Sequence, residues 1–466
     1  LKGLRFRSVR TARLAGPLAC HALLRASPTG ARPESMQCGW CAGRCEASRD
    51  EFELGVAEFA ASAAAGVVEN AGVSFSGDAF RQLGPAQSAF LLRSLGAVVC
   101  ARSFRELGLP ACQELFADLG PAWMAALLAG VGAEFTASLF VRCGVGFTSD
   151  LFVALDTDYL LLLFQELGVG FVAALFASLG HEAIAKIYTA LGNRAIAALY
   201  KGVGSSWTAE MHKSLRSPYV IQLYGALGAE FVADVFVDCG AAFVARVHAF
   251  LGVRFCIWLY RGLGVDYAAK LFSRLGVSFV GRMFLEVGGK FSGSLLGKLG
   301  VDFDADLFSS LGTLYVAELF RRAGVAWCRD VFTCVGTKFS ARLLRQLGVD
   351  YTASLYGFMG PHFSANIFDA LGHVWSATLF RHLGATFLGD LFRRLGVVFL
   401  GSFGRSLGPR YTVALVGDMG SLYTIALLIN YLCKGCCADA GSARTSLLRG
   451  DTISTNEAST DLSSPQ

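Results

Sequence analysis

Three cysteines near the start of the chain have the spacing of a metal half-site. Cys38, Cys41 and Cys45 form a C-x2-C-x3-C pattern, and thiolates at such spacing bind zinc or iron–sulfur clusters. A complete site needs a fourth ligand, and the adjacent sequence offers none. We therefore predict no metal and no cofactor, with a half-site as the alternative.

A second cysteine group, Cys433, Cys436 and Cys437, follows the apolar run Leu422–Leu432. Cysteines beside an apolar segment can be palmitoylated, but a capping helix at the end of the repeats explains the run more simply. Seven further cysteines scatter over varied positions of the chain's repeats. Scatter is typical of small buried hydrophobic residues, so the sequence predicts an intracellular, reducing compartment.

Two short motifs resemble enzyme signatures. Gly404–Gly408 matches G-x-S-x-G with Ser406 as nucleophile, and Gly168–Ala173 matches the dinucleotide-binding fingerprint. Both motifs require a strand directly before them, whereas both glycine pairs here include a member of a regular glycine series. The motifs are therefore by-products of a repeat, and the sequence predicts a protein that is not an enzyme and has no evident small-molecule substrate.

That glycine series sets the organisation of the chain. Thirty positions, spaced by twelve residues from Gly72 to Gly420, are glycine at all but two, which are Asp156 and Arg216. We call each such position a slot and number the residues after it one to eleven. The unit reads Gly, Val or Pro, x, aromatic, x, Ala, x, Leu, Phe, x, x, Leu. Internal repeats of this kind indicate an array rather than separate domains.

Periodicity and punctuation both favour helices. Apolar positions three, seven, eight and eleven lie on one face of a 3.6-residue helix. Within the repeats, proline occurs only one or two residues after a slot, where a helix tolerates it. Glycine suits the residue just past a helix end, because it adopts positive φ without strain. The alternative is a β-solenoid with a twelve-residue coil.

The sequence predicts an all-α fold, a solenoid of about 30 short antiparallel helices in 12-residue Gly-punctuated repeats. Two-residue connections would reverse each helix relative to the one before it. Deleting 24 residues should then be tolerated better than deleting 12, because only the longer deletion restores the alternation.

Three regions are expected along the chain. Residues 1–53 form a basic, cysteine-containing segment, residues 54–433 the repeat body, and residues 434–466 a disordered polar tail. Residues 1–33 have the composition of a transit peptide to a mitochondrion or plastid; the alternative is that translation starts at Met36. Within the body, Arg216 precedes Ser217-Pro218, so we expect an irregular joint with its own turn geometry at residues 212–219.

Composition limits the functional classes. Hydrophobic residues make up 54% of the chain and the net charge is +5. Charges and glycines interrupt every apolar stretch, so the sequence predicts no transmembrane span. A basic stripe in the second half is the candidate binding surface for RNA. Its members are Arg321, Arg322, Arg342, Arg345, Arg393 and Arg394.

The preferred functional hypothesis is a non-enzymatic helical-repeat scaffold that binds another macromolecule, with protein as the expected partner. An organellar RNA-binding repeat protein is the first alternative. A tandem-expanded repeat with little selected function is the second.

Overall fold

A computed structural model of the chain describes the backbone of residues 42–432 and the side chains of residues 78–432. The chain divides into two compact units, Leu1–Val56 and Ala57–Gln466, and the second contains the repeats. Within the described residues the structure is helical and contains no strand, which confirms the all-α prediction over the β-solenoid.

Seventeen labelled helices precede a last short helix, Ser421–Leu432. The labelled helices are α1 (Ala42–Leu119), α2 (Pro121–Val131), α3 (Ala133–Cys143), α4 (Val145–Ala154), α5 (Thr157–Leu179), α6 (His181–Val203), α7 (Ser205–Cys239), α8 (Ala241–Leu251), α9 (Val253–Leu263), α10 (Val265–Leu275), α11 (Val277–Val287), α12 (Gly289–Leu299), α13 (Val301–Leu311), α14 (Thr313–Met359), α15 (Pro361–Leu371), α16 (His373–Leu383) and α17 (Ala385–Met419). About thirty separate helices are therefore not found.

Each joint between units is a single residue. Gly264, with φ 84° and ψ 167°, donates its N–H to the Tyr260 carbonyl at 2.9 Å, and its own carbonyl accepts from Ala268 N–H at 3.2 Å. One residue thus ends one helix and begins the next. Only glycine adopts this combination of φ and ψ without strain, which explains the slot. In α5, α6, α7, α14 and α17 the same non-helical backbone occurs inside one labelled helix.

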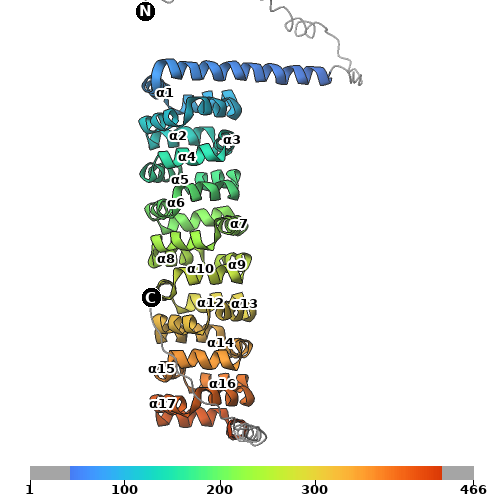
Figure 1. Ribbon diagram of the computed structural model, residues 1–466, viewed down its shortest axis with the longest axis vertical. Helices are drawn as coiled ribbons and strands as arrows, with labels where there is room; N and C mark the ends of the chain where they lie inside the picture. The colour runs from blue at the N-terminus through green and yellow to red at the C-terminus, as the bar shows by residue number, and fades with distance from the viewer. Residues whose placement is uncertain (1–41, 433–466) are drawn as a thin grey trace, which may run out of the picture. The chain divides into compact units, whose positions relative to one another are not determined.

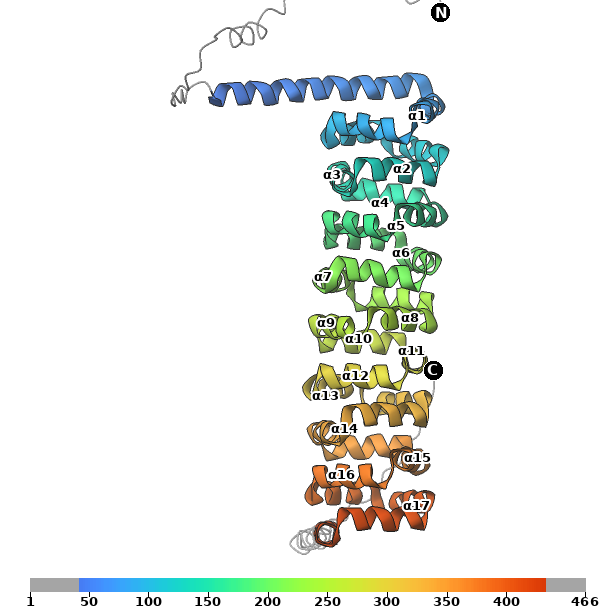
Figure 2. The ribbon, with the colours of Figure 1, turned by 180° about the vertical axis from the view of Figure 1, so that it is seen from behind.

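Consecutive units turn rather than reverse. The axes of α2 and α3 differ by 104°, those of α8 and α9 by 106°, and those of α17 and the last helix by 103°. The antiparallel prediction is wrong, because a one-residue joint in extended conformation cannot fold one helix back on another. Dividing 360° by 104° gives about 3.5 helices per turn. Figures 1 and 2 show the units from α2 to α17 stacked in chain order.

Contacts between turns follow from this geometry. In the run of single-unit helices, α8 packs on α11, α9 on α12 and α10 on α13. All seven tyrosines at position three donate a hydrogen bond to the carbonyl of position eight four units earlier. For example, the Tyr315 hydroxyl lies 2.7 Å from the Phe272 carbonyl oxygen and the Tyr267 hydroxyl 3.0 Å from that of Tyr224.

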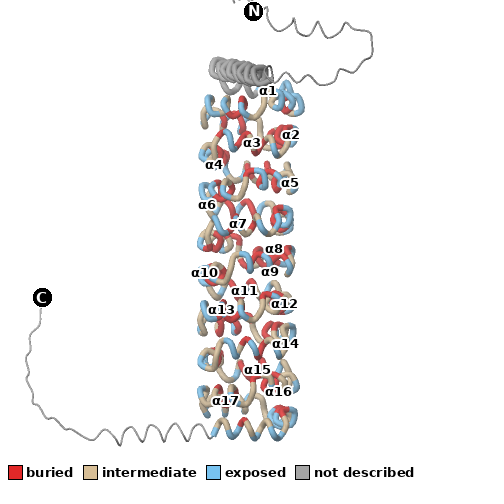
Figure 3. Tube along the Cα trace, turned by 90° about the vertical axis from the view of Figure 1, so that its right-hand side faces the viewer, coloured by how far each residue is buried: buried red, intermediate tan, exposed pale blue. Residues whose placement is uncertain are grey.

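The core comprises positions four, five, seven and eight of each unit. In α10 these are Ala268, Ala269, Leu271 and Phe272, all buried, while Tyr267 at position three is half-buried. Figure 3 shows buried and exposed residues alternating along each helix of the stack. The apolar face expected from positions three, seven, eight and eleven is thus extended to positions four and five, and position three is only half-buried.

Position five is small because position ten of the unit three later packs on it. A Cβ added at Gly202 would lie 2.5 Å from the Leu161 side chain, and one added at Gly262 would contact Ile221. Conversely, Gly293 at position five lies beneath Cys334 at position ten. A large side chain at one of these two positions is thus matched by a small one at the other, and Ile257 opposite Lys298 is the exception.

Both exceptional slots keep the backbone of the glycines. Arg216 has φ 65° and ψ 156°. Asp156 has φ 64° and ψ 172°, and its carboxylate accepts the Tyr159 N–H at 2.9 Å. The expectation of a different turn geometry at residues 212–219 is wrong, because the packing of adjacent turns holds Arg216 in the strained conformation.

The expectation of no transmembrane span is also contradicted. Asp78–Leu119, Thr157–Leu179 and Ser205–Cys239 are long and apolar enough to cross a membrane, and up to six spans result if each bent pair counts as one. The sequence argument treated every slot as a helix end. Thr157–Leu179 nevertheless meets the length and hydropathy test as one labelled helix, although Gly168 inside it has the non-helical backbone of a slot.

Candidate functional site

The side chains at position eight form an aromatic column inside the repeats that is unbroken from Phe164 to Phe284 and is interrupted elsewhere by leucines such as Leu128, Leu296 and Leu344. Rings of consecutive units lie about 6 Å apart, for example 6.1 Å between Phe164 and Phe176 and 6.1 Å between Phe272 and Phe284. The column follows from the turn of the chain, since position eight of every unit points to the axis around which the helices wind. Edge-to-face packing at this spacing stabilises aromatic pairs.

Within the run from Phe164 to Phe284, six members carry polar groups, and they pair in twos. Tyr200 donates to Tyr188 at 3.2 Å between hydroxyl oxygens. The others are His–Tyr pairs: His212 Nε2 lies 3.1 Å from the Tyr224 hydroxyl and His248 Nε2 lies 3.1 Å from that of Tyr260.

The backbone fixes the tautomer of both histidines. His212 Nδ1 lies 2.6 Å from the Thr208 carbonyl and His248 Nδ1 lies 2.8 Å from the Val244 carbonyl. A carbonyl only accepts, so Nδ1 carries the proton and Nε2 accepts from the tyrosine hydroxyl. Every polar atom of these two rings is satisfied.

This arrangement excludes an open catalytic site at the column. His212 is 2% exposed and His248 is 6% exposed. The cavity beside them, which Phe243 and Cys239 also line, measures about 30 Å³. Such a volume holds about one water molecule. Each histidine is therefore a core residue whose two ring nitrogens are hydrogen-bonded to a backbone carbonyl and a tyrosine hydroxyl. Neither ring faces an open cleft.

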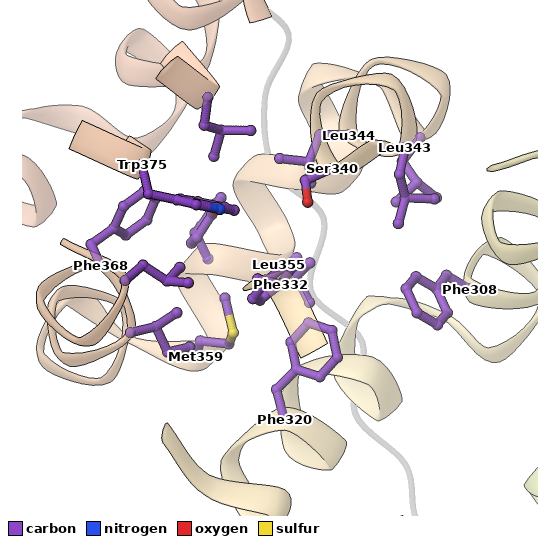
Figure 4. A pocket seen from close by; sticks show the side chains of 15 residues that line it. Phe308, Phe320, Phe332, Ser340, Leu343, Leu344, Leu355, Met359, Phe368 and Trp375 are labelled. Carbon is purple, nitrogen blue, oxygen red and sulfur yellow. The ribbon is translucent and has the colours of Figure 1, made fainter. Parts of the chain in front are cut away.

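A second cavity, of about 40 Å³, is lined by residues of α13, α14, α15 and α16 and is mostly apolar. Figure 4 shows Phe308, Phe320, Met359 and Trp375 around it. Among the labelled side chains Ser340 brings the one hydroxyl, which donates to the Gly336 carbonyl at 3.0 Å. The cavity is thus small and its lining is almost entirely apolar.

One buried acid stands apart from this satisfied interior. Asp304 occupies position four of its unit, is 0% exposed, and neither carboxylate oxygen has a hydrogen-bond partner. Burial raises the pKa of Asp304 from 3.8 to about 8. Serine or threonine at this position instead donates to the slot carbonyl, as Ser292 does to Gly288 at 3.0 Å.

The structure brings His362 to the G-x-S-x-G serine. His362 Nδ1 lies 2.6 Å from Ser406 Oγ, while Ser406 Oγ donates to the Ser402 carbonyl at 2.9 Å. The serine proton therefore points away from the imidazole, the reverse of general-base activation. Ser406 also lies within α17 and not on the strand-to-helix turn of a nucleophile elbow.

The six candidate arginines lie two each in the units that start at Gly312, Gly336 and Gly384, and four of them have an acidic partner. Arg321 and Arg322 both contact Glu318, at 3.7 and 2.8 Å. Arg394 contacts Asp350 at 3.1 Å, and Arg393 pairs with Asp390. Arg342 and Arg345 are exposed. RNA phosphates would have to compete with these carboxylates, although exposed pairs of this kind contribute little stability.

The cysteine predictions have separate outcomes. Cys38 and Cys41 and the group from Cys433 onward lie outside the described residues, as does the side chain of Cys45. Of the seven repeat cysteines, Cys334 is exposed and the remaining six are buried, as expected of small hydrophobic residues. Among the described residues no group of three His, Cys, Asp or Glu side chains could hold a metal ion.

An exposed tryptophan provides a different kind of site. Trp258 at position six of α9 is 46% exposed, and the Arg254 guanidinium lies 4.6 Å from its ring centroid. Such a cation–π contact holds both side chains on the helix surface. Phe250, near the end of the preceding helix α8, is 48% exposed. The site was not predicted from the sequence, because position six is a small or polar residue in nearly all other units, with Phe90 and Leu162 as the exceptions.

No family model, curated protein or solved structure matches this sequence.

Proposed function

We propose that the repeat body is a non-enzymatic scaffold of short helical units that binds another protein through its outer surface. The observation that carries the proposal is the Trp258–Arg254 pair. Tryptophan and arginine are the residue types most enriched among those that dominate protein–protein binding energy. Both are held in place before binding, so little side-chain entropy is lost on association.

The rest of the molecule supports a surface function. The interior is filled by the aromatic column, and the described cavities are no larger than about 40 Å³. The outer positions of successive units offer variable side chains on a regular framework, which is how repeat proteins form extended binding surfaces.

The test is affinity capture with the full chain from a lysate of its source. A double variant, Arg254→Ser with Trp258→Ser, should lose one specific protein that the parent retains. Phe358→Ser removes another exposed aromatic residue, 49% exposed, and should retain that protein.

Equal capture by both variants would contradict the proposed site. If capture disappears instead after ribonuclease treatment, or falls steeply with salt, the RNA-binding alternative is favoured. Circular dichroism of each variant checks that the helices remain.

A further inference from the structure

The last turn of the repeats exposes an uncharged apolar surface, which we call the end face. It comprises nine side chains that are each more than 40% exposed: Val397, Val398, Val413, Val416, Leu422, Ile425, Leu428, Ile429 and Leu432. In the other described residues only fourteen large apolar side chains reach that exposure, spread over 78–396. Exposed apolar side chains are therefore concentrated in the last described units, and such a concentration marks an interaction site.

Its origin is the geometry of the stack. Each unit is covered by the units three and four later, and within residues 42–432 the last units have no such later unit. Val413 at position five is 73% exposed, whereas Ala377 at the same position is buried. Leu428 at position eight is 52% exposed, whereas Phe380 is buried.

The last described unit has an apolar outer face, unlike the terminal units of soluble repeat arrays. Terminal repeats normally have a polar outer face. Here no Asp, Glu, Lys or Arg occurs from Met419 to Leu432, and outer positions two and nine are Leu422 and Ile429. Leu422 is 84% exposed.

Another turn of the same repeat fits this end poorly. Val413 and Ile425 are large at position five, where Leu161 and Ile221 lie opposite glycine at position ten of the covering unit and Ile257, opposite Lys298, is the exception. The first described units of a second copy would instead place Ser94, Glu106 or Asp118 there. The chain's own residues 433–466 are also poor in large apolar side chains, with three leucines and one isoleucine.

The charges beside the end face are positive. Arg405 and Arg410 are exposed, and neither has an ion pair with an acid in the described part of the chain. The neighbouring acid, Asp418, accepts a hydrogen bond from His373 at 2.5 Å. A two-fold contact between end faces of two copies would bring these arginines toward each other, whereas anionic headgroups would neutralise them.

We propose that the end face docks onto an anionic lipid surface. Leu422, Ile425, Leu428 and Ile429 enter the headgroup–acyl boundary, and Arg405 and Arg410 contact lipid phosphates and carboxylates. The bent pair of α17 and Ser421–Leu432 is also one of the segments apolar enough for a membrane. This site is separate from Trp258, so it stands independently of the protein-binding proposal.

The experiment is flotation of the purified full chain with phosphatidylcholine vesicles, with and without phosphatidylserine. We expect binding that phosphatidylserine strengthens. The double variant Leu422→Asp with Ile425→Asp should reduce binding at least about tenfold. Arg405→Gln and Arg410→Gln should each reduce binding to anionic vesicles about fivefold and leave binding to neutral vesicles unchanged.

Matched controls separate lipid docking from general stickiness. Leu314 and Val374 are 63% and 61% exposed but lie outside the end face, so Leu314→Asp and Val374→Asp should bind vesicles like the parent. Equal loss in these controls, or no vesicle binding by the parent, would overturn the proposal. A dimer in sedimentation velocity without lipid, abolished by the Leu422/Ile425 double variant, would show that a second copy covers the face instead. Retention in the membrane after alkaline carbonate extraction would indicate spanning helices and would also overturn it.

Discussion

Replacing Asp304 with serine should stabilise the region around α13, and more so as the pH rises. The carboxyl is fully buried without a partner, and burial raises its pKa from 3.8 to about 8. Between these values the folded chain keeps a proton that the unfolded chain releases. The contribution of Asp304 to stability is therefore greatest below about pH 4, falls as the pH rises and levels off above about pH 8.

The magnitude follows from the width of that window. Each pH unit within it lowers the free energy of unfolding by about 1.4 kcal/mol. From about pH 5 to pH 8 the titration of Asp304 therefore lowers the free energy of unfolding by roughly 4 kcal/mol. Asp304→Ser removes the titrating group, and the new hydroxyl can donate to the Gly300 carbonyl as Ser292 does to Gly288.

Hydrogen–deuterium exchange of α13 peptides measures this difference locally, which suits an array whose units open separately. The protection of the variant relative to the parent should increase about a thousandfold between about pH 5 and pH 8. Asp306→Ser, on the exposed side of the same helix, should show no such increase. A constant ratio for Asp304→Ser across that range would refute the reasoning about its burial.

Three further predictions concern the joints and the contacts between turns. Arg216→Gly should raise the free energy of unfolding, measured by calorimetry, by about 1–3 kcal/mol, because it relieves a strained backbone. Asp156→Gly should raise it less, since this variant loses the hydrogen bond to Tyr159 N–H. Equal increases for the two variants would argue against a contribution from that bond. Tyr315→Phe should lower the free energy of unfolding, measured with denaturant, by about 1 kcal/mol, because it removes the hydrogen bond to the Phe272 carbonyl. An unchanged free energy of unfolding would mean that water replaces the lost hydroxyl as donor. Gly202→Ala should destabilise by about 1–3 kcal/mol through overpacking on Leu161, and Leu161→Ala should rescue it, whereas additive losses would contradict the matching of size between the two positions.

The helices and their joints were predictable because the local signals agree. Glycine at the slot, proline just after it and the apolar face of each unit all indicate a helix that ends every twelve residues. The prediction at Arg216 failed because Ser217-Pro218 is locally typical of a β-turn, whereas Arg216 has the backbone conformation of the glycine slots.

The direction of successive helices was not predictable from length alone. Reversal requires a connection of at least two residues, and the slot provides one, so the bend of about 104° had to be observed. The number of residues in one turn of the stack is nevertheless reflected in the spacing of paired residues. Leu161 and Gly202, like Ile221 and Gly262, are separated by 41 residues, which is close to one turn.

The candidate sites were mostly missed, and their signals are substitutions within the unit. His212 and His248 replace phenylalanine at position eight, and Asp304 is charged where position four is otherwise apolar, Ser or Thr. Trp258 similarly departs from the pattern of position six. The arginine stripe drew attention through composition, which carries no information about partners such as Glu318.

Thermal unfolding of two deletions tests most directly the central claim that single-residue joints make all units equivalent. One deletion removes residues 264–275 and the other removes residues 264–287, and each rejoins complete units. Because every unit is related to the next by the same turn, both deletions should leave a helical array with similar, modestly lowered unfolding temperatures. A 12-residue deletion that is far less stable than the 24-residue deletion would contradict this claim and would restore the antiparallel arrangement.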